Sequence, residues 1–114
     1  MNIRIETTDT FVKNFKKLTK RYKSLPNELR KLKTELLENP ELGIDLGNNV
    51  RKIRIAIKSK GRGKSGGARI ITHQTVIIEI SQRIITLVLI YDKSDKDSIS
   101  KNEILSILSN EDLI

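Results

Sequence analysis

The side chains best suited to chemistry in this sequence are cations in and around a glycine-rich stretch that runs from Lys58 to Arg69. Glycines at positions 61, 63, 66 and 67 let the backbone turn and approach a ligand closely. Between Leu46 and Ile78 the chain carries no carboxylate and eight basic residues: Arg51, Lys52, Arg54, Lys58, Lys60, Arg62, Lys64 and Arg69. This imbalance predicts an anion-binding surface, with a polyphosphate chain as the most obvious ligand.

One specific phosphate-binding motif is excluded. The stretch contains Gly63-Lys64-Ser65, but a P-loop also needs a glycine five residues before Gly63, where this chain has Lys58. A P-loop also leads into a helix, whereas the β-branched run that follows here predicts a strand. A nucleotide triphosphatase is therefore excluded. The alternatives are a solvated hairpin loop or a phosphodiester-binding loop, and we favour the second, with these cations as contacts: Lys58, Lys60, Arg62, Lys64 and Arg69.

Three further side chains could move protons or orient a substrate. His73 is the only histidine and could act as a general acid or base, or equally be a structural residue without chemistry. Tyr91 ends an apolar run and is followed by Asp92 and Lys93, so a phenol and an ammonium could lie over the same face as Arg69. The alternative for Tyr91 is a strand-end tyrosine whose hydroxyl reaches water.

Composition narrows the possible partners. The chain of 114 residues is the size of one domain, which we assign to residues 1–114. A formal net charge of +8 favours an acidic partner, nucleic acid first, and four aromatic residues leave few rings for stacking on bases. Contacts with nucleic acid are therefore expected to be mainly electrostatic.

The same composition excludes several kinds of site. With no cysteine and one histidine, disulfides, thiolate nucleophiles and multi-histidine metal sites are ruled out, and we expect neither metal nor cofactor. No apolar run has the length of a membrane span, and the polar start of the chain is not a signal peptide. We therefore expect a cytoplasmic protein with no membrane partner.

Periodicity predicts the elements that must position these side chains. Residues 2–7 alternate as in a strand, and two helices follow, one from Asp9 and one ending before Asn39. Their apolar stripes are Phe11, Phe15, Leu18 and Tyr22, then Leu25, Leu29, Leu32 and Leu36. Strands are predicted over residues 50–58, 68–79 and 84–91, and Ser100 with Glu103 predicts the capping box of a last helix.

This order predicts an α+β fold, in which a small antiparallel sheet packs against an N-terminal helical hairpin and a short helix ends the chain. The helices should cover the face that carries Ile53, Ile55 and Ile57. The opposite face then carries Arg54 and Lys58, and Arg69 is expected to join them because an arginine without a partner is costly to bury beside the core.

Four segments together resemble the RelE/ParE superfamily of toxins from type II toxin–antitoxin systems, most closely its RelE and HigB-like branch. They are Leu42 to Gly47, Val50 to Ile57, Gly61 to Arg69 and Leu89 to Lys93, of which the run Lys64-Ser65-Gly66-Gly67-Ala68-Arg69 is the most specific. The element order predicted above also matches the family's order, and the resemblance implies the family's α+β fold of the microbial-ribonuclease type.

The resemblance implies an endoribonuclease that cuts mRNA on the ribosome, inhibits translation and is silenced by a cognate antitoxin. The family's activity uses the RNA 2′-hydroxyl as nucleophile and needs no metal, so DNA cleavage is not expected. It implies catalytic roles for Arg69, Lys64, Tyr91 and Lys93, with Arg69 as the clamp on the scissile phosphate. RNA-binding roles fall to Arg54, Lys58, Lys60, Arg62 and His73, and His73 stands where related sequences often have an aromatic residue.

The same superfamily contains a second activity. ParE-type members act on DNA gyrase by protein binding and do not cleave RNA, so the fold alone does not prove cleavage. The presence of Arg69 and of Tyr91-Asp92-Lys93 favours the ribonuclease branch.

Overall fold

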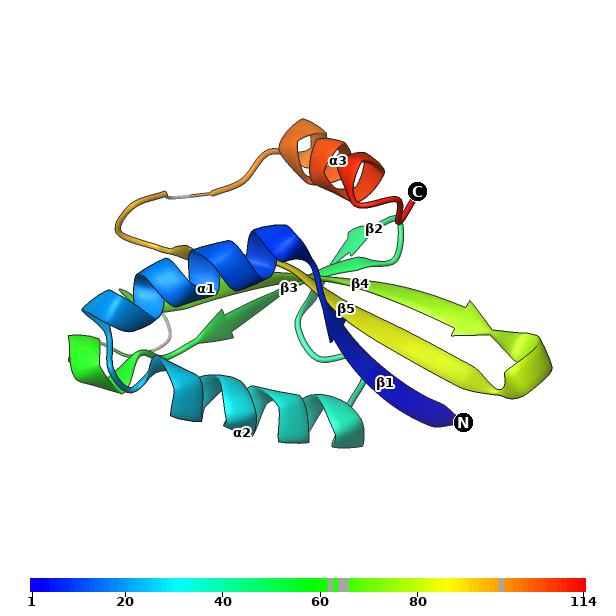
Figure 1. Cartoon of the computed structure of the whole chain (residues 1–114), viewed down its shortest axis with the longest axis horizontal. Helices are drawn as coiled ribbons and strands as arrows, with labels where there is room; N and C mark the ends of the chain where they lie inside the picture. The colour runs from blue at the N-terminus through cyan, green and yellow to red at the C-terminus, as the bar shows by residue number, and fades with distance from the viewer. Residues whose placement is uncertain (62, 64–65, 97) are drawn as a thin grey trace.

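The computed structural model of the chain (Figure 1) describes residues 1–61, 63, 66–96 and 98–114. Helices and strands follow one another in the predicted α+β order, with one additional short strand after the second helix. The elements are β1 (Asn2–Thr7), α1 (Asp9–Arg21), α2 (Leu25–Glu38), β2 (Ile44–Gly47), β3 (Val50–Ile55), β4 (Ala68–Ile77), β5 (Gln82–Asp92) and α3 (Lys101–Asn110).

A single sheet of five strands in the order β1-β5-β4-β3-β2 forms the centre of the fold. Strands β3 to β5 are antiparallel neighbours, as predicted, and the additional strand β2 is antiparallel to β3, but β1 pairs with β5 in parallel. The helical hairpin between β1 and the rest of the sheet explains this direction, because it carries the chain back along the sheet before the next strand begins. The α+β fold is therefore confirmed, with a mixed sheet in place of a purely antiparallel one.

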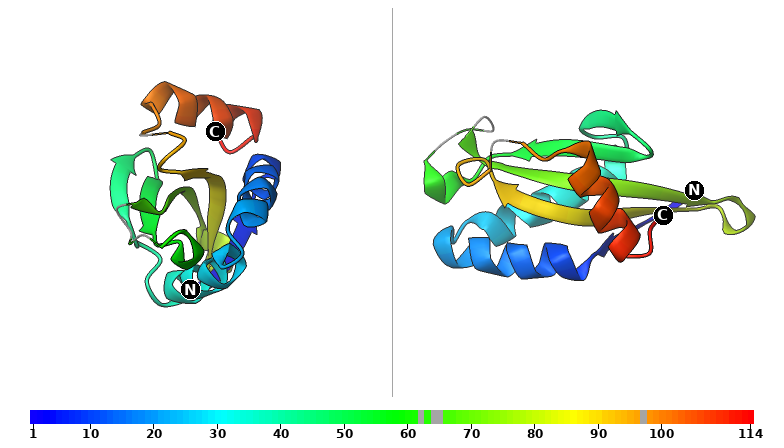
Figure 2. Two further views of the ribbon diagram at one scale, coloured as in Figure 1. Left: turned by 90° about the vertical axis from the view of Figure 1, so that its left-hand side faces the viewer. Right: turned by 90° about the horizontal axis from the view of Figure 1, so that it is seen from above.

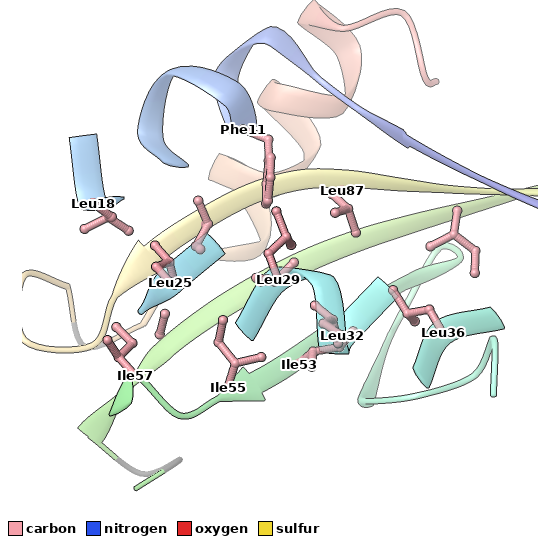
Figure 3. Close-up of a cluster of buried hydrophobic side chains, with 14 residues drawn as sticks. Phe11, Leu18, Leu25, Leu29, Leu32, Leu36, Ile53, Ile55, Ile57 and Leu87 are labelled. Carbon is pink, nitrogen blue, oxygen red and sulfur yellow. The ribbon is translucent and has the colours of Figure 1, made fainter. Parts of the chain in front are cut away.

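The helical hairpin of α1 and α2 covers one face of the sheet. Thr8 begins α1 as its N-cap, accepting a hydrogen bond from the Phe11 N–H at 2.9 Å, and its hydroxyl also donates to the carbonyl oxygen of Val88 at 2.7 Å. Figure 3 shows the apolar core under the hairpin, where leucines of α2 meet isoleucines of β3. Its labelled members are Phe11, Leu18, Leu25, Leu29, Leu32, Leu36, Ile53, Ile55, Ile57 and Leu87.

Helix α3 packs on the opposite face of the sheet (Figure 2). The predicted capping box is present, with the Ser100 hydroxyl accepting from the Glu103 N–H at 3.1 Å. Ile104 and Leu108 of this helix contact a second apolar cluster that includes Tyr91. The sheet is thus buried on both faces, by two helices on one side and one on the other.

The prediction was wrong in two local details. The connection after α2, for which no strand was predicted, contains β2, which turns into β3 through Asn48 and Asn49, both with positive φ. Asparagine tolerates this left-handed backbone, which two-residue hairpin turns require. The strand predicted to reach Lys58 ends at Ile55, and a 3-10 turn follows because the Glu28 carboxylate of α2 accepts the Lys58 N–H at 2.7 Å.

The hairpin of β4 and β5 extends beyond the rest of the molecule on the side of the N-terminus (Figure 1). Its end carries exposed apolar side chains, Val76, Ile78 and Ile80. Among the described residues, no helix has the length and apolar character needed to cross a membrane.

Candidate functional site

Three predicted site residues form one row across the sheet. Arg54 of β3 pairs with Arg69 of β4, and Arg69 pairs with Tyr91 of β5. Residues directly opposite on neighbouring strands project from the same face. Since the flanking residues Ile53 and Ile70 belong to the core under the helical hairpin, the row lies on the other face, which we call the outer face.

The row places two guanidinium-bearing residues directly opposite each other. Like charges in this arrangement repel, and an anion bound between them relieves the repulsion. A phosphodiester group matches this position, because guanidinium groups bind phosphate oxygens through paired N–H donors. Arg54 is exposed at the rim, whereas Arg69 is only 4% exposed. The strand register places Arg69 on the face opposite the hairpin, as expected from the sequence. The side chain is nevertheless buried on that face.

Tyr91 lies beside Arg69 in the row, beneath α3. It is 7% exposed and packs in the cluster that α3 completes, and within the described chain its hydroxyl has no hydrogen-bond partner. Burial is the main cause that raises the pKa of Tyr91, with Arg69 and Lys96 opposing the shift. The phenol is therefore protonated at neutral pH and is available as a proton donor to a group that enters this space.

The residue after Tyr91 ties the site to the rest of the fold. The Asp92 carboxylate is buried, and it accepts hydrogen bonds from the Tyr22 hydroxyl and the Lys60 ammonium, each at 2.6 Å. The Ser94 N–H also donates to it at 2.9 Å, and Arg21 approaches to 3.3 Å. Burial alone would raise the pKa of Asp92, but these donors outweigh it and lower the pKa to about 2. The C-terminal end of α1, the start of the glycine-rich stretch at Lys60 and the end of β5 therefore meet at one ionised carboxylate.

Two lysines predicted to bind RNA have different surroundings. The Lys60 ammonium is engaged by Asp92 and by the Ser94 hydroxyl at 2.5 Å, so in this structure it fixes the base of the loop. Lys58 is exposed, and its side chain lies near Lys31 of α2. In this state Lys58 has the more accessible charge of the two.

His73 and Lys93 flank the row at different distances. His73 pairs with Val50 and Thr86, four residues along β4 from Arg69, which corresponds to roughly 13 Å of strand. It is buried, its Nδ1 has no hydrogen-bond partner within the described residues, and burial lowers its pKa, so it is neutral at pH 7. Lys93 follows the row directly, and its N–H donates to the Gly67 carbonyl oxygen at 3.0 Å, which holds the chain after Tyr91 against the end of the basic loop.

Two further predicted residues, Arg62 and Lys64, lie outside the described residues. Within the part of the chain that the structure describes, no three His, Asp or Glu side chains gather in a group that could hold a metal ion. The described donors of the site are cations and a phenol, which suit an anionic ligand.

Sequence reasoning missed the anchoring role of Asp92 and the part that Arg21 and Tyr22 take in it. Tyr22 was assigned only to the apolar stripe of the first helix, and Arg21 was given no role at a site. Their partner is Asp92, which is 70 residues from Tyr22 in the chain. The available signal was the aspartate itself, since a carboxylate directly after a buried strand needs donors.

Two comparisons with known proteins bear on this arrangement. A structure of a double arginine-to-alanine mutant of the E. coli toxin RelE, in the free state, is similar with a TM-score of 0.55 and 18% sequence identity, covering 85% of this chain and 90% of that one. At this identity the likeness shows a shared fold. The model of the family described as the RelE toxin of the RelE/RelB toxin–antitoxin system matches residues 4–110. The chain therefore belongs to the family of RelE toxins of toxin–antitoxin systems.

Proposed function

We propose that this toxin is a ribosome-dependent mRNA endoribonuclease that acts in the cytoplasm and inhibits translation. The observation that carries the proposal is the row of Arg54, Arg69 and Tyr91 across three neighbouring strands, next to a loop rich in cations. A row of this kind combines phosphate-binding groups with a protonated phenol on one surface. Its net positive surroundings attract RNA, and membership of a family that generally comprises endoribonucleases supports cleavage of the bound strand.

The proposed reaction is transfer of the phosphate to the neighbouring 2′-hydroxyl. The 2′-oxygen attacks phosphorus, the bond to the 5′-oxygen breaks, and a 2′,3′-cyclic phosphate and a free 5′-hydroxyl remain. Arg69 binds the non-bridging oxygens, where negative charge increases in the transition state. Lys64 is the proposed proton acceptor, because neighbouring cations depress the pKa of a lysine.

The leaving oxygen needs a proton. Tyr91 is suited to donate it, because its hydroxyl is protonated at neutral pH and its position in the row is next to Arg69. Lys93 is the alternative donor or an orienting charge. Since Arg69 and Tyr91 are buried in the free toxin, we infer that α3, which packs against Tyr91, shifts when RNA binds.

Expression of the toxin in a bacterial host tests the proposal. After brief induction, growth should stop and the 5′ ends of cellular RNA should map to new cuts inside translated messages. The Arg69→Ala variant should grow normally and leave messages intact, while an exposed-site control, Lys16→Ala, should behave as wild type. Growth arrest by Arg69→Ala at wild-type strength would contradict the role of Arg69. Induced DNA damage with intact messages would instead support the gyrase-directed alternative.

A further inference from the structure

A second feature lies away from the row, at the edge of the sheet formed by β1. In Figure 1 this strand lies at the margin of the sheet and leads out to the N-terminus. It pairs with β5 on one side, and within the described chain no strand pairs with its other side. An edge strand with unpaired backbone groups is a template for the pairing of another strand.

Two hydrogen bonds show which residues of β1 carry the unpaired backbone groups. The Asn2 N–H donates to the Ser81 carbonyl oxygen at 2.8 Å, and the Thr8 N–H donates to the Leu87 carbonyl oxygen at 3.1 Å. The even-numbered residues of β1 therefore direct their backbone groups toward β5. Because the direction alternates along a strand, the backbone groups of the odd-numbered residues point to the open side. These residues are Ile3, Ile5 and Thr7.

The side chains of β1 alternate between the two faces of the sheet. Ile3 and Ile5 pack against the core under the helical hairpin, so Arg4 and Glu6 project from the outer face. There the Arg4 guanidinium and the Glu6 carboxylate form an ion pair at 2.6 Å, and their side chains are 60% and 40% exposed. The open edge thus carries one positive and one negative charge, on either side of Ile5.

These charges select one register for a second copy of the strand. In an antiparallel pair related by a two-fold axis, an axis at Arg4 or at Glu6 places that residue opposite its own copy, where like charges repel. An axis at Ile3 or at Thr7 pairs fewer residues of the strand. With the axis at Ile5, Arg4 lies opposite Glu6 of the second copy, and the symmetry repeats this contact on the other side of the axis.

The open backbone groups fit the same register. With the axis at Ile5, odd-numbered residues lie opposite each other, so Ile5 faces its own copy and Ile3 faces Thr7 of the second copy. Each of these pairs can exchange two N–H···O bonds. Arg4 and Glu6 then occupy the positions without hydrogen bonds, where opposite Cα atoms are closest, at about 4.5 Å. Backbone direction and charge are independent observations, and both favour the axis at Ile5.

We propose that two copies of this toxin associate through β1, as antiparallel strands related by a two-fold axis at Ile5, which joins their sheets into one. A ladder of main-chain hydrogen bonds supplies the affinity, and two reciprocal pairs of Arg4 with Glu6 set the register. The association goes beyond the proposed function and does not depend on RNA cleavage, because the row lies on β3, β4 and β5.

Sedimentation equilibrium of charge variants tests the register. All proteins carry Arg69→Ala, so that the cells tolerate expression, and circular dichroism verifies that each is folded. This parent protein should dimerise as its concentration rises from about 1 µM to about 300 µM, the range expected for weak association through a small interface. Arg4→Glu and Glu6→Arg should each weaken dimerisation at least about tenfold, because each places like charges opposite one another.

Combining the two substitutions gives the sharpest outcome. The double variant Arg4→Glu/Glu6→Arg again has opposite charges across the axis and should dimerise within about threefold of the parent. A mixture of the two single variants should likewise form a mixed dimer. The matched charge controls are Lys16→Glu on α1 and Glu38→Arg on α2, both at exposed positions, and they should change dimerisation less than about twofold.

Amide hydrogen exchange at low and high concentrations of the parent protein tests the ladder. The amides of Ile3, Ile5 and Thr7 should exchange more slowly at high concentration, whereas those of Arg4 and Glu6, which already face β5, should not change. A parent that stays monomeric, a dimer that Arg4→Glu does not weaken, a double variant that does not recover, or protection without this alternation would overturn the proposal. Because none of these measurements involves cut messages, failure of the ribonuclease proposal is detected separately.

Discussion

The two faces of the sheet differ in what they bury. Under the helical hairpin the main buried cluster is built from phenylalanine, leucine, isoleucine and alanine, and the buried carboxylates on that side, Glu28 and Asp92, both accept hydrogen bonds. The outer face buries Arg69, His73 and Tyr91, and two of the three unpartnered polar atoms in the described chain, His73 Nδ1 and the Tyr91 hydroxyl, belong to it. We therefore propose that the hairpin face provides stability, while the outer face retains polar groups at a cost in stability for the binding of a substrate.

The largest expected effect on the free energy of unfolding comes from a substitution in the core under the helical hairpin. Phe11 is 1% exposed and stacks on Phe15, with ring centroids 5.9 Å apart. Phe11→Ala removes this packing and leaves a cavity, so the free energy of unfolding should fall by about 3–5 kcal/mol. Urea denaturation measures the change, and Val12→Ala, at the partly exposed next position, should cost less than about 1 kcal/mol. Similar losses for both variants would argue against the core described here.

The second largest expected effect comes from Asp92, whose carboxylate joins the end of β5 to Tyr22 and Lys60. Asp92→Asn removes the negative charge that holds Lys60, and we expect a loss of about 2–3 kcal/mol at pH 7. The pKa of Asp92 is about 2 in the folded state and lower than in the unfolded chain. Its contribution to stability is therefore present above pH 4 and lost as pH falls toward 2, by about 2 kcal/mol.

Urea midpoints measured from pH 7 down to pH 2 check this linkage. The difference in stability between wild type and Asp92→Asn should shrink as the solution becomes more acidic. A difference that stays constant over this range would contradict the assignment of the low pKa to Asp92.

The smallest expected effect on stability comes from a substitution on the outer face, at Tyr91. Tyr91→Phe removes a buried hydroxyl that has no partner within the described residues, so stability should stay the same or rise by up to about 1 kcal/mol. Cleavage of RNA should nevertheless fall, because the proton donor is lost. Thermal unfolding and cleavage are measured on the same preparation. A clear loss of stability, or full cleavage by Tyr91→Phe, would contradict the proposed role.

The hairpin face was predictable because its information is local. Phe11 and Leu18 recur at helical spacing, and alternating isoleucines predicted β3. The capping box at Ser100, which predicted α3 on the outer face, is local in the same way. Strand β2 was missed because four residues between glycines and asparagines give no clear period. Its turn at Asn48-Asn49 was the usable signal.

The outer face depends on information that is not local. The strand around Ile70 and Ile71 is apolar on both faces, so its pattern could not decide which face Arg69 joins, and that choice comes from the register with β3 and β5. The pairing of Lys60 with Asp92 joins residues 32 positions apart. The parallel direction of β1 likewise depends on where the hairpin returns the chain.

The most direct test of the different roles of the two faces measures ribosome-dependent cleavage of one message by purified proteins, alongside the urea stability of each. Arg69→Ala should cleave on the order of 10²–10³-fold more slowly per folded molecule, with the folded fraction taken from its own urea curve. Phe11→Ala should lose stability, yet its folded fraction should cleave at the wild-type rate. Cleavage by Arg69→Ala at the wild-type rate would contradict the assignment of the reaction to the outer face.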